Sequence, residues 1–528
     1  MKSTFDDDEG VRGFNDWAKG NGIPSAPDGA FVLPGGSVKI LESARQLFET
    51  IAPRYELFTR GKVIVTLQPG LEGDPVLEPL SPSAARSFFE EHVPIWAWRS
   101  YRGGQPVLKP ATMPEDTARA LLNCHLARKI LPAINGLVNC PVLTEEKEGL
   151  RIIGKGYDAE TGLLVLHGEQ PPDVPLAEAV HSLKELLIDF DFQTEGDISR
   201  AMAAFLAPAL KMGNLLRGYV PADVAEANQS QSGKTYRQRI CSAIFGERSA
   251  IVTLKKGGVG SIDESFSQKL VNGRPFIQFD NFRGLLDSAA LEAFMTAERE
   301  YHCRVPRCGE IIVDPSRFFV QLSSNGVEIT RDFANRASIV RIRKREGVQF
   351  PDTLGVVRAR QAYYLGCVFA VVREWFTQGK PRTLETRHDF REWCQTLDWI
   401  VQNIFGMAPL MDGHTEAQVR VSNPTLTFLR QIALEIEQRS MLEEELSASQ
   451  LLEIAQTADI AIPGLGQQHI GDDEKGKQRI GIKLAPIFKD HQTASVEGFV
   501  VERIEKAQAN DKGGDFIMKL YRFSRAAQ

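Results

Sequence analysis

Residues 228–235 read Asn-Gln-Ser-Gln-Ser-Gly-Lys-Thr and decide the expected fold, because they match the P-loop motif at every signature position but one. Backbone N–H groups of such a loop bind phosphates, Lys234 reaches the β- and γ-phosphates, and the Thr235 hydroxyl ligates Mg²⁺. Asn228 replaces the first glycine of the motif, and asparagine tolerates left-handed dihedrals. The predicted nucleotide-binding residues are Asn228, Gln229, Ser230, Gln231, Ser232, Gly233, Lys234 and Thr235.

A Ser-Gly-Lys-Thr tetrapeptide also arises by chance at the start of a basic helix, so the assignment depends on partners further along the chain. The run from Pro275 to Asn281 reads as a short apolar strand that ends in the carboxylate of Asp280. A carboxylate at that end of a strand faces the phosphates and holds Mg²⁺ directly or through water. The alternative is a buried strand whose aspartate only begins a turn. We expect Thr235 and Asp280 to be the metal ligands.

Two further elements follow in the order of a motor ATPase. A third predicted strand, starting at Phe318, ends at Asn325, whose amide would orient the attacking water or contact the γ-phosphate. Arg336 then precedes a fourth strand, where it would reach the nucleotide of a neighbouring subunit as an arginine finger. Alternatively, Arg336 pairs with Asp332 at a helical spacing of four. Four elements in this order arise by chance much less often than one, so together they predict a P-loop ATPase.

The composition is that of an ordinary globular protein. The chain has 528 residues, 43% of them hydrophobic and 25% charged, which excludes collagen-like, disordered and disulfide-scaffold classes. The acidic start and the absence of a long apolar run predict a soluble, cytoplasmic protein without a membrane partner. Seven scattered cysteines indicate reduced thiols, and no second close pair completes a zinc site around Cys303 and Cys308. The net charge of −6 means that contact with DNA would depend on local basic patches.

Patterning along the chain predicts an α/β protein with several domains. An Asp-, Gly- and Pro-rich start precedes mixed strands and helices, and the chain closes with helices followed by a hairpin, Gly498 to Ile504 with Phe516 to Phe523. The expected parts are a flexible arm at 1–35, an N-terminal α+β domain at 36–175, the P-loop ATPase core at 176–350, a helical segment at 351–419 and a winged-helix-like domain at 420–528.

Several segments resemble helicase-like P-loop ATPases of phages, plasmids and integrative elements, which are superfamily-3-like or AAA+ replication proteins. These segments are Ser261–Glu264, Phe279–Phe282, Ser324–Gly326 and Asp332–Arg336. The resemblance implies a homo-hexameric, DNA-translocating ATPase: an ATP-dependent DNA helicase or replication-initiation motor of a mobile genetic element. Its partners would be DNA and other replication proteins.

This sequence departs from that family at positions that bear on catalysis. Asn281 follows Asp280 where many motor ATPases have a glutamate as catalytic base, the sensor has one asparagine where relatives often have two, and Asn335 replaces one member of a frequent arginine pair. Glu264, between the two Walker motifs, is the candidate base, and the alternative is that Glu264 caps a helix. The predicted catalytic residues are Lys234, Glu264, Asp280, Asn281, Asn325 and Arg336.

Basic loops flank the predicted core strands and are candidates for DNA contact. They contain Lys255 and Lys256, and Arg304 and Arg307. Further basic runs lie at 341–345 and 475–489, and Pro486 would shorten a recognition helix there. The alternative for each patch is a solvated surface.

A second function fits the same motifs: a nucleotide-switched AAA+ regulatory or assembly ATPase that binds DNA or protein without unwinding. A phosphotransferase is disfavoured, because the order of Asn325 and Arg336 is that of oligomeric motors and no separate acceptor site is apparent.

Overall fold

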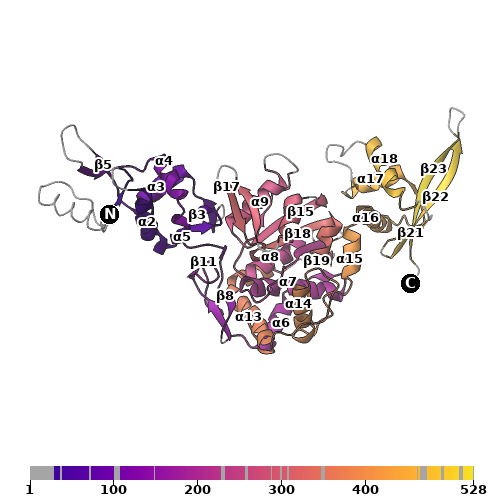
Figure 1. Cartoon of the computed structure of the whole chain (residues 1–528). Coiled ribbons are helices and arrows are strands. Elements are labelled where there is room, and N and C mark those ends of the chain that lie inside the picture. Colours follow the sequence, from indigo (N-terminus) through magenta and orange to yellow (C-terminus); the bar gives the residue numbers. More distant parts are fainter. Residues whose placement is uncertain are drawn as a thin grey trace.

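The structure is a computed structural model in which three lobes follow one another along the chain (Figure 1). The N-terminal lobe lies at the left of Figure 1, the largest lobe at the centre and the C-terminal lobe at the right. Most of the expected arm, and residues 228–231 of the P-loop motif, lie outside the described residues. The described residues are 29–35, 39–70, 73–99, 107–147, 149–227, 232–255, 260–286, 288–297, 300–305, 309–345, 351–460, 462–463, 473–488, 493–496, 498–509 and 515–526.

A six-stranded sheet forms the centre of the middle lobe. Neighbouring strands are parallel except at one edge, where the short first strand is antiparallel to the second. The strand that leads into the P-loop motif and the strand that carries Asp280 both pair with β18, so the carboxyl ends of all three meet at one edge of the sheet. In spatial order the strands are β12 (Asp191–Phe192), β19 (Ala337–Arg343), β13 (Ala222–Ala227), β18 (Phe319–Ile329), β15 (Phe276–Leu286) and β14 (Ala250–Ile251).

Helices cover both faces of this sheet, because side chains alternate along each strand. Phe276 packs in the apolar cluster that contains residues of α6, α7, α8, α13 and α14, whereas its neighbour Ile277 packs in the cluster that contains residues of α9 and α10. The helices are α6 (Leu176–Glu185), α7 (Glu195–Met212), α8 (Lys234–Ile244), α9 (Ile262–Asn272), α10 (Ala289–Thr296), α11 (Arg331–Asn335), α12 (Thr353–Ala359), α13 (Gln361–Thr377), α14 (Arg391–Asn403) and α15 (His414–Val421).

Helix α7 is attached to β19 through buried charges. Thr194 and Asp197 form a capping box at the start of α7. Asp197, which is fully buried, also pairs with Arg200 (2.7 Å) and with Arg341 (3.2 Å). Arg343 binds Asp191 at 3.0 Å. Of the basic run at 341–345, Arg341 is therefore bound in the core, whereas Arg343 is exposed and pairs at the surface.

The part of the chain before the central sheet contains small sheets and short helices. The N-terminal lobe shares an apolar cluster of the central sheet through Phe58, Val65 and Leu77. The later strands, with Val142, Ile153 and Leu163, belong instead to the cluster around α7 and α13, and Figure 1 shows β8 beside α13. Residues Gly156–Asp158 form the strand β10, which pairs with β11 in antiparallel fashion. The elements are β1 (Phe31–Val32), α2 (Ile40–Ile51), β2 (Leu57–Arg60), β3 (Val63–Pro69), β4 (Pro75–Pro79), α3 (Pro82–His92), β5 (Ile95–Arg99), β6 (Val107–Pro110), α4 (Glu115–Leu122), α5 (Ala127–Ile130), β7 (Gly136–Val138), β8 (Val142–Glu146), β9 (Gly149–Ile153), β10 (Gly156–Asp158) and β11 (Leu163–Val165).

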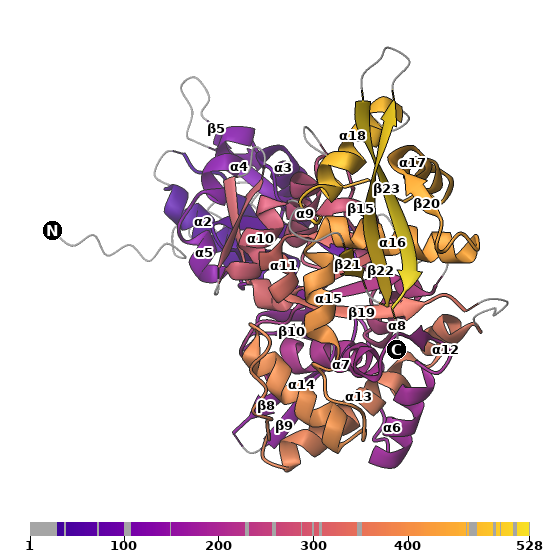
Figure 2. The same cartoon turned by 90° about the vertical axis from the view of Figure 1, so that its right-hand side faces the viewer.

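The C-terminal lobe combines three helices with a four-stranded sheet in the order β20-β23-β22-β21, and Figure 2 shows α16, α17 and α18 beside this sheet. Ser447 and Gln450 form a capping box at the start of α17, and α18 ends at Leu484, before Pro486. The elements are α16 (Pro424–Gln438), β20 (Glu445–Ser447), α17 (Ala448–Thr457), α18 (Asp473–Leu484), β21 (Thr493–Val496), β22 (Phe499–Ala509) and β23 (Asp515–Arg525). Within the described ranges, no helix is both long and apolar enough to span a membrane.

Candidate functional site

The candidate site lies where the P-loop motif enters α8, at the carboxyl edge of the central sheet. Gly233 is the N-cap residue of α8 and has a φ of 88°, a left-handed value that suits glycine. Lys234 and Thr235 follow as the first two residues of the helix. The N–H groups and the positive dipole end of α8 are therefore at the same place as these two side chains, which favours binding of an anion.

Three side chains from α8, β15 and β18 converge at this edge. The Thr235 hydroxyl lies 2.7 Å from Oδ1 of Asp280 and 3.0 Å from Oγ of Ser323. The Ser323 hydroxyl donates to the same Asp280 oxygen at 2.7 Å. The two residues that the sequence predicts as metal ligands are therefore in direct contact, although 45 positions separate them.

The Thr235 and Asp280 oxygens fit Mg²⁺. This ion takes hard oxygen ligands in an octahedron at about 2.0–2.1 Å, which places neighbouring ligands about 3 Å apart. The spacing of 2.7 Å between the two oxygens is close to that value. Among the described residues, no group of three or more His, Cys, Asp and Glu side chains is placed to hold a metal. Mg²⁺ sites in nucleotide-binding proteins use one or two carboxylates together with substrate phosphates.

Lys234 is a buried cation beside this pair. Its residue is 7% exposed, and its ammonium group donates to the Ser232 hydroxyl at 3.2 Å. Burial lowers the pKa of Lys234 from 10.5 to about 8, and the charge of Asp280 acts in the opposite direction. An anion bound next to Lys234 would favour its charged form.

The strands around the site continue further than the sequence indicates. The pattern places strand ends at Asp280 and Asn325, but β15 runs to Leu286 and β18 to Ile329, because their extensions pair with each other. The pairing register shifts between Phe279 and Phe282. At this irregularity Asn281 has a φ of 51° and donates its backbone N–H to Ser323. The side chain of Asn325 lies outside the described part of the chain.

Glu264, the candidate base, makes a local contact. Its carboxylate accepts the backbone N–H of Gly260 at 2.6 Å, just before α9. Ser261 is the N-cap residue of α9 and accepts the N–H of Glu264. This geometry agrees with the helix-capping alternative for Glu264.

Arg336, the candidate arginine finger, contacts its own chain. Its guanidinium lies 3.0 Å from the carboxylate of Asp332, four residues earlier in the same segment. The Arg336 side chain is 17% exposed and that of Asp332 is 71% exposed. This geometry agrees with the alternative in which Arg336 pairs with Asp332 of its own chain.

Of the four predicted DNA contacts, Lys255 is exposed after β14, at the carboxyl edge of the sheet. Lys256 and Arg307 lie outside the described residues, as does the side chain of Arg304. The backbone of Arg304 belongs to a hairpin formed by β16 (Tyr301–Val305) and β17 (Gly309–Val313).

Sequence reasoning missed two side chains that contact Asp280 directly. Ser323 lies two residues before Asn325 on β18, a spacing that puts both on one face of a strand. Arg239 lies 3.8 Å from the second Asp280 oxygen and is four residues after Thr235 on α8. The sequence shows the spacing of Ser323 from Asn325 and of Arg239 from Thr235. Only the assembled sheet brings these two side chains to Asp280.

A buried ion pair next to the site was missed as well. Glu226, near the end of β13, pairs with Arg420 of α15, and both residues are buried. The Arg420 carbonyl accepts the hydroxyl of Thr427 in α16 at 2.9 Å. The pair therefore connects the strand before the P-loop motif to the first helix of the C-terminal lobe.

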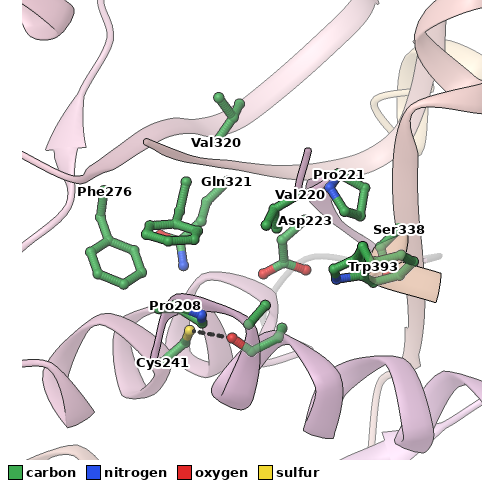
Figure 3. A pocket seen from close by; sticks show the side chains of 13 residues that line it. Pro208, Val220, Pro221, Asp223, Cys241, Phe276, Val320, Gln321, Ser338 and Trp393 are labelled. Atoms are coloured by element: carbon green, nitrogen blue, oxygen red, sulfur yellow. Dashed lines mark hydrogen bonds between the residues drawn. The ribbon is translucent and has the colours of Figure 1, made fainter. Parts of the chain in front are cut away.

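A cavity lies at the opposite, amino-terminal edge of the central sheet (Figure 3). It has about 370 Å³ of empty space, including its opening to solvent, and its lining includes Asp223, Phe276, Phe319 and Trp393. None of the predicted site residues lines it, so it is separate from the Thr235–Asp280 edge.

Comparisons with known proteins give distant likenesses only. No family model and no curated protein matches the chain. The apo structure of the C-terminal region of NrS-1 is 11% identical, with a TM-score of 0.35, over 90% of this chain and 98% of that one. The structure described as SCCmec type IV Cch, active helicase, is 11% identical, with a TM-score of 0.30, over 84% of this chain and 81% of that one. At these values the likeness carries no argument about function.

Proposed function

We propose that this chain is an ATPase that couples ATP hydrolysis to DNA unwinding, as a helicase or replication-initiation motor of a mobile genetic element. The observation that supports this best is the contact of Thr235 with Asp280 beside the buried Lys234. These groups come from two sequence motifs 45 residues apart, the P-loop motif and the strand that carries Asp280, and each has a stated role toward Mg²⁺ or a phosphate. We assign the middle lobe to a superfamily-3-like or AAA+ core on this basis.

In the proposed reaction the chain binds and orients the nucleotide. The N–H groups at the start of α8 donate to phosphate oxygens, and Lys234 places its ammonium group against the β- and γ-phosphates. Thr235 and Asp280 hold Mg²⁺, which when bound would neutralise developing charge on the phosphates. Asn281 carries an amide and cannot take the proton of the attacking water. Glu264 remains the proposed base, with Asn325 orienting the water.

The strand order supports a sensor role for β18. This strand lies between β13, which leads into the P-loop motif, and β15, which carries Asp280. A polar side chain on β18 is therefore between the phosphate end and the metal end of the site. The C-terminal lobe, in which three helices precede the long β22–β23 pair, supports a winged-helix-like domain that binds DNA.

A second candidate is the nucleotide-switched AAA+ ATPase that does not unwind DNA. The pairing of Arg336 with Asp332 in the same chain favours it, because a motor ring needs Arg336 at the interface with its neighbour. In the helicase proposal Arg336 leaves Asp332 when a second subunit of a homo-hexamer presents its nucleotide.

The test is ATP hydrolysis and strand displacement by the wild-type chain and by Lys234→Ala. We expect DNA-stimulated hydrolysis and directional displacement in the wild type, and loss of both in the variant with the fold intact. Lys184→Ala, which removes an exposed lysine of α6, is the matched control and should behave as wild type. Wild-type turnover in Lys234→Ala would refute the nucleotide site. ATP hydrolysis without strand displacement would favour the nucleotide-switched ATPase that does not unwind DNA.

A further inference from the structure

Ser323 is fully buried on β18 and lies at the centre of the candidate metal site. A serine hydroxyl has one proton to donate and two lone pairs to accept with. The backbone N–H of Asn281 donates to Ser323 at 2.8 Å, and the Thr235 hydroxyl lies 3.0 Å from it. The proton of Ser323 is therefore directed to Oδ1 of Asp280, at 2.7 Å. Ser323 therefore accepts from Asn281 and donates to Asp280 at this one place.

Two of these contacts fix the shape of β15 at Asp280. The left-handed φ of Asn281 and the register shift between Phe279 and Phe282 mark a bulge in the strand. Asparagine tolerates a left-handed φ better than most residues, but the conformation still needs support from its surroundings. Ser323 supplies that support, because it binds the N–H of Asn281 inside the bulge and the carboxylate of Asp280 next to it.

We propose that Ser323 is a positioning residue for the metal, which holds the Asp280 carboxylate against the Thr235 hydroxyl before Mg²⁺ arrives. This inference rests on the proposed function, since it concerns the same nucleotide site. Ser323 is not a ligand in this assignment. It acts through Asp280, in the way that outer hydrogen-bonding partners orient the ligands of other metal sites and affect metal affinity by 10–100-fold.

The adjacent residue provides a matched control. Ser324 is also fully buried on β18, but its hydroxyl donates to the backbone carbonyl of Phe282 at 2.6 Å. Ser324→Ala thus removes a buried hydroxyl from the same strand without removing a hydrogen bond to Asp280. A merely structural role of Ser323 predicts the same result for both alanine variants.

The experiment measures Mn²⁺ binding by electron paramagnetic resonance, with the full chain and a non-hydrolysable ATP analogue. We expect Ser323→Ala to weaken Mn²⁺ binding by roughly 10–100-fold and to raise the Mg²⁺ requirement of hydrolysis by a similar factor. The KM for ATP at saturating Mg²⁺ should change little. Ser324→Ala should retain the wild-type metal affinity, and Ser323→Thr, which keeps the hydroxyl, should restore most of it.

Ser323→Cys is a second variant in case the alanine variant does not fold. It replaces the hydroxyl with a slightly larger thiol, which is only a weak donor to Asp280, so metal affinity should fall with the fold intact. Wild-type Mn²⁺ affinity in folded Ser323→Ala or Ser323→Cys overturns the inference and leaves the proposed function standing. If the wild-type chain itself binds no Mn²⁺ with the nucleotide, both the inference and the proposed function are wrong.

Discussion

Nucleotide binding should consume a proton at Lys234. Burial lowers the pKa of this residue from 10.5 to about 8, so a neutral amine is present in the free site at mildly alkaline pH. Bound phosphates favour the charged form and raise the pKa again. Binding at a pH above about 8 therefore requires proton uptake, and nucleotide affinity should fall as the pH rises.

The size of the effect follows from the protonated fraction of Lys234. With a pKa of about 8 this fraction is about three quarters at pH 7.5 and about one tenth at pH 9. The apparent affinity for ATP should therefore be about eightfold weaker at pH 9 than at pH 7.5. The phosphates of the nucleotide add little, because a phosphate monoester titrates near pH 6.

Isothermal titration calorimetry measures both the affinity and the proton uptake, when it is repeated in two buffers with different ionisation enthalpies. We expect uptake of about 0.9 proton at pH 9 and of about a quarter of a proton at pH 7.5. An unchanged affinity, or no uptake at pH 9, would refute the assignment of Lys234 to the phosphates.

A second buried lysine titrates in the same range and provides the control. Burial lowers the pKa of Lys211 to about 8, and its ammonium group donates to the carbonyls of Leu216, Arg217 and Gly218. Lys211→Arg keeps a cation that stays charged throughout this range. The variant should retain the eightfold change, because Lys211 has no role at the nucleotide.

Three further outcomes are expected. Asp280→Ala should lower Mg²⁺-dependent turnover by at least about 100-fold with an unchanged circular dichroism spectrum, because it removes the only carboxylate assigned to the metal; retained turnover would place the metal elsewhere. Arg239→Ala should lower the Mg²⁺ concentration for half-maximal hydrolysis by about two- to fivefold, because a half-exposed cation 3.8 Å from Asp280 competes with the metal, and an unchanged value contradicts this. Mixing Lys234→Ala with Arg336→Ala subunits should restore part of the hydrolysis that each lacks. If Arg336 only pairs with Asp332, a contact worth about 0.2–0.5 kcal/mol, Arg336→Ala should hydrolyse ATP as wild type does.

Short-range sequence signals predicted several elements well. The predicted hairpin, Gly498 to Ile504 with Phe516 to Phe523, corresponds to β22 and β23. The capping box of Ser447 and Gln450 is a signal of the same local kind, because its two partners are three residues apart. Such features depend on residues within one turn of helix or one strand pair.

The lengths of β15 and β18 could not be predicted from such short-range signals. The polar residues Asp280 and Asn325 look like strand ends, because turns favour such side chains. In the structure each extension finds its hydrogen-bond partner in the other, with Gly284 opposite Val327. A polar residue inside a strand is tolerated where the strands are paired on both sides of it.

The sequence by itself determined the P-loop motif, its helix and the carboxylate that follows, because each is a local pattern with a direct chemical meaning. Only the tertiary structure decided which side chains meet them. Ser323 and Arg239 contact Asp280 because β18 lies between β13 and β15 and because α8 crosses this edge of the sheet. Strand order depends on packing energies summed over both faces of the sheet. The spacing of residues along the chain does not specify the order of the strands. The contact of Ser323 with Asp280 depends on that order, so it could be identified only from the folded structure.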